Sequence, residues 1–177
     1  MVKTVLLLML AASSDSDADR LFREGKYAEA ADAYRSLLAD DPNSVDALGG
    51  LGRSLLESSH AAEAVPYLGR AAQMRPQDPS LKRSLAKALL GAGNAPAAIG
   101  LLEPMATRDT KDAEAALLLG EVMYRGGYYQ RSLQLLEQGL ALEPGNLAAK
   151  RMAAVALAKV GRVAEAAAAC EASASKS

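Results

Sequence analysis

Only one group of side chains in the sequence has the residue types of a nucleophilic triad. The single histidine, His60, follows Ser58 and Ser59, and Glu57 and Glu63 lie on either side of it. A serine, a histidine and an acid act together only when a rigid scaffold fixes their mutual geometry. The surrounding pattern indicates instead a tight turn between two helices. We therefore predict that His60 is a turn residue and that the chain has no catalytic residue.

Three other features suggest metal or phosphate chemistry but lack the required spacing. The acidic run of residues 15–19 has no distal glutamate of a calcium loop, so we interpret it as solvated acids at a helix start. The glycines of 91–93 and 126–127 follow no strand and precede no Gly-Lys-Ser/Thr, which a phosphate loop needs. One cysteine and one histidine cannot form a Cys/His zinc site. The sequence thus predicts no metal and no cofactor.

The composition is typical of a folded protein without a nucleic-acid role. The chain has 177 residues, of which 50% are hydrophobic and 23% are charged, too apolar for a disordered chain. Twenty basic and 21 acidic residues give a net charge of −1, and stacking aromatic residues are scarce. Both properties argue against nucleic acid as a partner. A single cysteine leaves no intramolecular disulfide.

The N-terminal residues 1–13 have the outline of a secretory signal. Lys3 precedes an apolar run from Val5 to Ala12, and small residues follow, so cleavage is expected after Ser13 or nearby. The run is far shorter than the roughly 20 residues that span a bilayer, so no transmembrane span is expected. The alternative is an apolar lead-in that packs on the following helices. An export signal would place the protein in the cell envelope or periplasm; otherwise a cytoplasmic location is expected.

The chain repeats itself at one constant interval along its length. Small residues recur in two columns, at 18, 52, 86, 120 and 154 and at 30, 64, 98, 132 and 166. Larger residues recur four positions after the second column, at Tyr34, Leu68, Leu102, Leu136 and Cys170. Glycine or serine recurs at 25, 59, 93, 127 and 161, and proline at 42, 76 and 144, with Thr110 in the third place. Because Cys170 stands in a column of large residues, we predict a buried structural thiol there.

Each repeat has the pattern of two helices joined by a turn. Leucines between Val45 and Ser58 follow helical spacing, and a second apolar-periodic segment runs from residue 61 to 72. The glycine or serine column supplies the turn, because glycine tolerates the left-handed conformation that ends a helix. The small columns suit helix crossings, where a bulky residue would overpack by roughly 1–3 kcal/mol.

These columns resemble the tetratricopeptide repeat. Repeat two matches its pattern at Leu48, Leu51-Gly52, Leu55, Ala64, Leu68, Ala71 and Pro76. The resemblance implies an all-α, right-handed superhelical solenoid that fills residues 14–177 as a single domain. Its five helix-turn-helix repeats are expected at about 11–44, 45–78, 79–112, 113–146 and 147–177.

Two repeats depart from the family pattern. Pro104 lies inside the second helix of repeat three, and its missing N–H should kink or shorten that helix. Repeat five is rich in alanine and has no obvious polar capping helix. Repeat arrays usually need polar terminal faces. The last helix is therefore expected either to fray or to contact another molecule.

The resemblance also implies a binding groove, lined by the first helices of successive repeats. The groove residues we expect to bind a partner are Arg53, Leu56, Arg83, Lys87, Leu90, Leu117, Glu121, Tyr124, Arg125 and Arg151. Arg53, Arg83 and Lys87 favour an acidic segment, and the apolar members favour a partner helix or strand. The alternative for each leucine is packing between neighbouring helices. The asparagines of the family's two-carboxylate clamp are missing from the groove, so binding of a chaperone C-terminus is disfavoured.

Three functional hypotheses follow. The leading one is a non-enzymatic protein–protein interaction scaffold that binds a peptide or helix of an unidentified partner in the groove. The alternative is a self-assembling structural protein, a homo-oligomer in which the groove or the C-terminal helix accepts another copy. An accessory subunit of an enzyme is the least favoured of the three.

Overall fold

The computed structural model describes residues 17–107 and 111–174, with side chains as far as residue 169. The predicted leader, Asp15, Thr110 and the side chain of Cys170 lie outside the described residues. All regular structure in the described part is helical. A first helical segment covers residues 17–23. The later helices are α2 (Tyr27–Asp40), α3 (Val45–Glu57), α4 (Ala61–Met74), α5 (Pro79–Gly91), α6 (Ala95–Leu102), α7 (Ala113–Arg125), α8 (Tyr129–Leu142), α9 (Leu147–Lys159) and α10 (Val163–Ala174).

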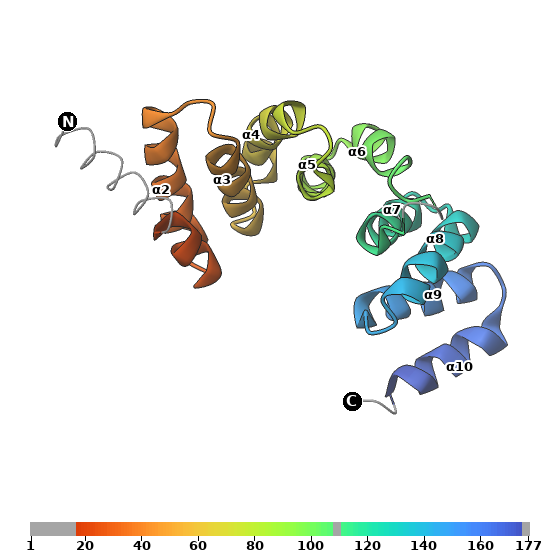
Figure 1. The fold of residues 1–177 in the computed structure, drawn as a ribbon. Coiled ribbons are helices and arrows are strands. Elements are labelled where there is room, and N and C mark those ends of the chain that lie inside the picture. The colour runs from red at the N-terminus through yellow and green to blue at the C-terminus, as the bar shows by residue number, and fades with distance from the viewer. Residues whose placement is uncertain (1–16, 108–110, 175–177) are drawn as a thin grey trace, which may run out of the picture. The chain divides into compact units, whose positions relative to one another are not determined.

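The helices form two compact units that divide between Asn94 and Ala95. In unit 1, α2 packs against α3, α3 against α4 and α4 against α5, and α3 also contacts α5 directly (Figure 1). In unit 2, each helix from α6 to α9 packs against its successor, and α7 also contacts α9. The segment 17–23, α3, α5, α7 and α9 are the first helices of the five repeats, and α2, α4, α6, α8 and α10 are the second helices.

The first helices begin at a recurring side-chain cap. A cap residue stands at the same repeat position each time: Ser44, Asp78, Asp112 and Asn146. Each side chain accepts a hydrogen bond from a backbone N–H of the first helical turn, as from Ala149 to Asn146 at 3.0 Å. Such a cap satisfies a donor that the helix cannot, and it stabilises a helix by about 0.5–2 kcal/mol. The constant repeat length therefore fixes the helix starts.

The predicted glycine or serine column forms the turn inside each repeat. Its members have positive φ angles of 76°, 66°, 81°, 81° and 87° at Gly25, Ser59, Gly93, Gly127 and Gly161. Four of the five positions are glycine, which adopts this conformation without steric cost. Ser59 is the exception, and its side chain makes the same conformation strained. His60 follows Ser59 as an exposed residue at the start of α4, which confirms its prediction as a turn residue.

The two small-residue columns are buried, and in repeats two and four they lie where the two helices of the repeat cross. Every alanine of these columns is at most 7% exposed. A Cβ atom on Gly52 would lie 2.4 Å from Cγ of Leu68, so α3 and α4 approach closely only because Gly52 has no side chain. Ser132 replaces alanine in unit 2 and donates from Oγ to the Gly120 carbonyl at 2.7 Å. The predicted packing role of these columns is confirmed.

The second helix of repeat three is short, as Pro104 predicted. Helix α6 has 8 residues and ends at Leu102, whereas α4 and α8 have 14 each. Residues 103–107 continue as turns and bends. Pro66 lies within α4 without ending it.

Candidate functional site

Three basic side chains lie on α3 and α5, two first helices of unit 1 that touch. Arg53 on α3 and Lys87 on α5 occupy the same position in successive repeats, and Arg83 lies one helical turn before Lys87. Leu56 and Leu90 follow Arg53 and Lys87 by three residues, so they share the same side of each helix. We call these five residues the α3–α5 face. Lys87 is exposed and the other four are half-buried.

A pair of glycines allows neighbouring helices to pack closely around α3. A Cβ atom on Gly49 would lie 3.0 Å from Cδ2 of Leu81 on α5 and 3.4 Å from a terminal nitrogen of Arg53. On Gly50 it would lie 2.3 Å from the ring of Tyr34 on α2. Because these two glycines have no side chain, side chains of α5 and α2 pack against α3 at neighbouring positions. The Arg53 side chain lies back over Gly49, close to the contact between α3 and α5.

The acidic side chain near Arg53 is already held by another residue. Asp46 accepts two hydrogen bonds from the guanidinium of Arg75, at 2.5 and 3.1 Å. The hydrogen bond from Arg75 lowers the pKa of the Asp46 carboxyl, and the charges of Arg75 and Arg53 lower it further. Asp46 is therefore ionised at neutral pH, and both of its oxygens are engaged by Arg75 rather than by Arg53.

The apolar members of the face belong to a column that is partly exposed in four repeats. Phe22, Leu56, Leu90 and Tyr124 occupy the same position in successive repeats, and all four are half-buried. The two aromatic members each pack edge-on against a second ring five residues later. The ring centroids are 5.3 Å apart for Phe22 and Tyr27 and 5.6 Å apart for Tyr124 and Tyr129. This column therefore offers apolar surface beside the charged positions.

The groove residues predicted in unit 2 lie in different surroundings. Glu121 and Arg125 form an ion pair at 2.6 Å on α7, and Arg151 is exposed on α9. Leu117 is only 9% exposed and fills the space above Gly139, where a Cβ atom would lie 2.5 Å from its Cδ2. Leu117 therefore packs in the core between α7 and α8, the alternative left open for the leucines, and it offers little surface to a partner.

In the described residues, no group of histidine, cysteine and acidic side chains is arranged to hold a metal ion. The Oγ of Ser58 donates to the Ser54 carbonyl at 2.5 Å, so this hydroxyl is engaged with the backbone beside His60. No helix among residues 17–107 and 111–174 is long and apolar enough to cross a membrane.

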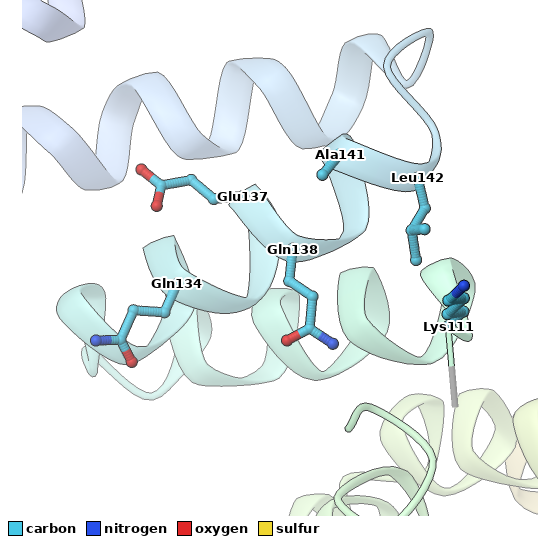
Figure 2. Close-up of a pocket in the computed structure, with 6 residues that line it drawn as sticks. All are labelled: Lys111, Gln134, Glu137, Gln138, Ala141 and Leu142. Carbon is cyan, nitrogen blue, oxygen red and sulfur yellow. The ribbon is translucent and has the colours of Figure 1, made fainter. Parts of the chain in front are cut away.

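A second set of polar residues lines cavities along α8 and was not singled out from the sequence. Gln134 and Gln138 point to the same side of α8, toward the cleft that Lys111 and Leu142 close at one end (Figure 2). The signal was present as glutamine at 130, 134 and 138, a spacing of four residues on an exposed helix. The groove that the family resemblance implies lies on first helices, whereas these glutamines lie on the second helix α8.

Comparisons with solved structures identify the fold. The crystal structure of MamA protein is 22% identical, with a TM-score of 0.79, over 94% of this chain and 91% of that one. MamA residues 41 to the end, from Desulfovibrio magneticus RS-1, are 18% identical, with a TM-score of 0.81 and 93% of both chains covered. YrrB, described as a TPR protein with an unusual peptide-binding site, is 19% identical, with a TM-score of 0.70 over 90% and 82% of the chains.

Family models give the same assignment from the sequence. Two tetratricopeptide repeat models match residues 17–80 and 55–122. A third model, for subunit 3 of the anaphase-promoting complex or cyclosome, matches residues 91–173. No curated protein sequence matches the chain. The periodic caps, the turns and the small-residue crossings agree with these matches, and the chain belongs to the tetratricopeptide repeat family.

Proposed function

We propose that the protein is a non-enzymatic scaffold that binds an acidic segment of a partner protein on the α3–α5 face. The repeat fold supports a role in protein–protein interaction. The observation that carries the finer proposal is the recurrence of a cation, Arg53 and then Lys87, at one position of two helices that touch. Arg83 adds a third cation beside them.

The contacts of the α3–α5 face explain why an acidic and partly apolar segment would suit it. Arginine pairs with carboxylates through two parallel hydrogen bonds, which fixes the geometry of an acidic side chain. Leu56 and Leu90 lie next to the cations and are half-buried, so a partner side chain that covers them removes apolar surface from water. The expected ligand therefore combines aspartate or glutamate with apolar residues.

Peptide selection on the immobilised full chain tests this proposal. We expect the selected peptides to be enriched in aspartate and glutamate next to apolar residues, and to bind more weakly as salt rises. The double variant Arg53→Glu/Lys87→Glu should weaken the selected peptides at least tenfold, because each reversal replaces an attraction for an acidic side chain with a repulsion.

The matched control reverses two cations elsewhere in unit 1. Lys26 and Arg35 pair with Glu24 and Asp32 on exposed surface, outside α3 and α5. Lys26→Glu/Arg35→Glu changes the net charge by the same amount and should leave peptide binding nearly unchanged. Selected peptides without acidic enrichment, or equal losses in the two double variants, would contradict the assignment of the α3–α5 face.

Self-assembly is a second candidate, favoured by apolar side chains in repeat five. Leu147, Val155 and Val163 are 49%, 43% and 65% exposed. A second copy that covered them would bury surface that water now contacts. Light scattering with size-exclusion chromatography over a range of concentrations tests this candidate, and a monomer at every concentration argues against it.

The location of the protein remains part of the proposal. If residues 1–13 are an export signal, the scaffold acts in the cell envelope or periplasm, and otherwise it acts in the cytoplasm. Cell fractionation with mass spectrometry of the mature N-terminus distinguishes the two. An N-terminus close to Ser14 in the periplasmic fraction supports export, and an intact leader in the cytoplasmic fraction argues against it.

A further inference from the structure

Three adjoining cavities follow helix α8 in unit 2, and together we call them the α8 cleft. The cavity between Lys111 and Leu142 has a volume of about 450 Å³ (Figure 2). The middle cavity, beside residues 103–107, has about 420 Å³, and the third, beside Tyr128 and Val160, has about 470 Å³. Gln134 lines all three, so they are neighbouring parts of one surface.

The middle of the cleft lies next to the shortened helix α6. Because α6 ends at Leu102, the irregular segment 103–107 lies where a full second helix would continue. The middle cavity is bounded by this segment on one side and by α8 on the other, with the buried Leu119 and Leu135 at its base. The opening therefore depends on a feature particular to repeat three, Pro104, rather than on the repeat pattern.

Glutamine amides give the cleft the means to bind a peptide backbone. Gln138 Nε2 donates to the backbone carbonyl of Ala106 at 2.9 Å, so one glutamine of this row already binds main chain of an irregular segment. Gln134 points the same way one turn earlier (Figure 2), and its side chain is exposed. A primary amide carries the same donor and acceptor groups as a peptide bond.

The charges of the α8 cleft balance one another, in contrast to those of the α3–α5 face. Lys111 and Glu137 line the first cavity together, and Glu103 and Arg131 line the middle one. The third cavity has only Arg131, which it shares with the middle one. The whole cleft therefore carries two acids and two bases, and this balance favours an uncharged ligand over an acidic or basic one. The cleft therefore selects by amide hydrogen bonding and apolar contact.

Both ends of the cleft carry exposed apolar side chains. Leu142 is 43% exposed at one end, and Tyr128 is 67% exposed at the other. These residues are 14 positions apart, which on a helix corresponds to about 21 Å. An extended chain of about six residues covers that distance at roughly 3.3 Å per residue. Its terminal side chains would then cover Leu142 and Tyr128.

We propose that the α8 cleft is a second binding site, which holds an extended, uncharged segment of about six residues from a partner protein. The side-chain amide of Gln134 hydrogen-bonds the main chain of the segment. Apolar side chains at the two ends of the segment pack on Leu142 and Tyr128. This site is separate from the α3–α5 face and from its acidic ligand.

The test uses a library of blocked, uncharged hexapeptides with leucine or valine at both ends and serine, threonine or alanine between. Binding to the full chain is followed by NMR, through the backbone amides and the side-chain amides of the glutamines. We expect shifts at Gln134, Leu142 and Tyr128, and an affinity that changes little between low and high salt. Shifts absent from α8 for every peptide of the library overturn the proposal.

Two variants and one control identify the contacts. Gln134→Ala should weaken the best peptide about five- to tenfold, because one amide exchanges two hydrogen bonds with the peptide. Leu142→Asp should weaken it at least tenfold, because it places a charge under an apolar side chain. Gln73→Ala truncates an exposed glutamine on the second helix α4 of unit 1 and should have no effect. Equal affinities for Gln134→Ala and Gln73→Ala overturn the proposal.

The outcome is independent of the function proposed for unit 1. The variant Arg53→Glu/Lys87→Glu should abolish salt-dependent binding of acidic peptides and leave the hexapeptide affinity unchanged. Hexapeptide shifts that appear on α3 and α5 instead of α8 would contradict the α8 cleft and leave the α3–α5 face untouched. Loss of acidic-peptide binding alone would contradict only the α3–α5 face.

Discussion

Equivalent positions of the two units have the same packing role but different surface chemistry. The column that holds Arg53 and Lys87 in unit 1 holds Glu121 and Val155 in unit 2. The column of Arg83 holds Leu117 in unit 2, where the side chain is buried over Gly139. The repeat register therefore determines where a side chain lies along a helix. The residue type at that position determines whether the side chain is exposed to a partner, forms an ion pair or packs in the core.

The buried columns behave differently, because they have nearly the same residue types in both units. Leu51 and Leu119 are two repeats apart and are 0% and 1% exposed. Their surroundings differ in one respect, since Leu119 lies at the base of the cavity beside residues 103–107. Substitutions at equivalent buried positions and at equivalent surface positions of the two units can therefore test this difference.

The largest expected effect is on the equivalent leucines. Leu51→Ala and Leu119→Ala should each lower the free energy of unfolding by about 2–5 kcal/mol, through lost burial and the cavity left behind. We expect Leu51→Ala to cost more, because Leu119 already borders a cavity and loses fewer contacts. Urea unfolding followed by circular dichroism measures both. Lys159→Ala, at an exposed position, should cost little, and a cost equal to that of the leucines would contradict the assigned columns.

The next effect concerns the glycines at the helix crossings. A Cβ atom on Gly52 would lie 2.4 Å from Leu68, whereas on Gly120 it would lie 3.0 Å from Leu136. Gly52→Ala should therefore destabilise by about 1–3 kcal/mol through overpacking. Gly120→Ala should be nearly neutral, because alanine favours a helix over glycine by about 1 kcal/mol and offsets the smaller clash. Thermal unfolding measures the loss of stability in each variant. A larger loss for Gly120→Ala than for Gly52→Ala would contradict the tighter packing at Gly52.

Much of this fold could be predicted from the sequence because the steric requirements that determine it are local and recur in every repeat. The turn column and the small-residue columns each follow from the steric needs of one position, repeated in every unit of the array. The effect of Pro104 on α6 followed equally from one missing N–H. These predictions needed no knowledge of which side chains meet across the fold.

The candidate sites depend on contacts between side chains of different helices, and they were predicted less well. Asp46 and Arg75 are 29 residues apart, and no periodic column pairs them. The burial of Leu117 depends on Gly139, which leaves the space that the leucine fills. The cleft along α8 requires both the shortened α6 and the row of glutamines. A sequence pattern places each of these residues on a helix, but only the packing of neighbouring helices shows what they contact.

A smaller effect is expected at the turns, where the units differ in one residue. Ser59 and Gly127 occupy the same turn position, with φ angles of 66° and 81°. Ser59→Gly should stabilise by up to about 1 kcal/mol, because the left-handed strain of a non-glycine residue exceeds the entropy that glycine loses. Gly127→Ser should destabilise by a similar amount. Denaturant midpoints of the two variants measure the pair, and changes of the same sign would contradict the equivalence of the turns.

The smallest effect is the pH dependence of the ion pair between Asp46 and Arg75, which borders the α3–α5 face. Arg75 lowers the pKa of Asp46 in the folded state, so the pair stabilises the fold above the ordinary carboxyl pKa and loses its effect as pH falls through the lowered value. Both side chains are well exposed, and the contribution should stay below about 1 kcal/mol. Asp46→Asn should therefore be slightly less stable than the unaltered chain at neutral pH, and the difference should vanish in acid. A difference that grows as pH falls below about 4 would mean that Arg75 does not hold this carboxylate.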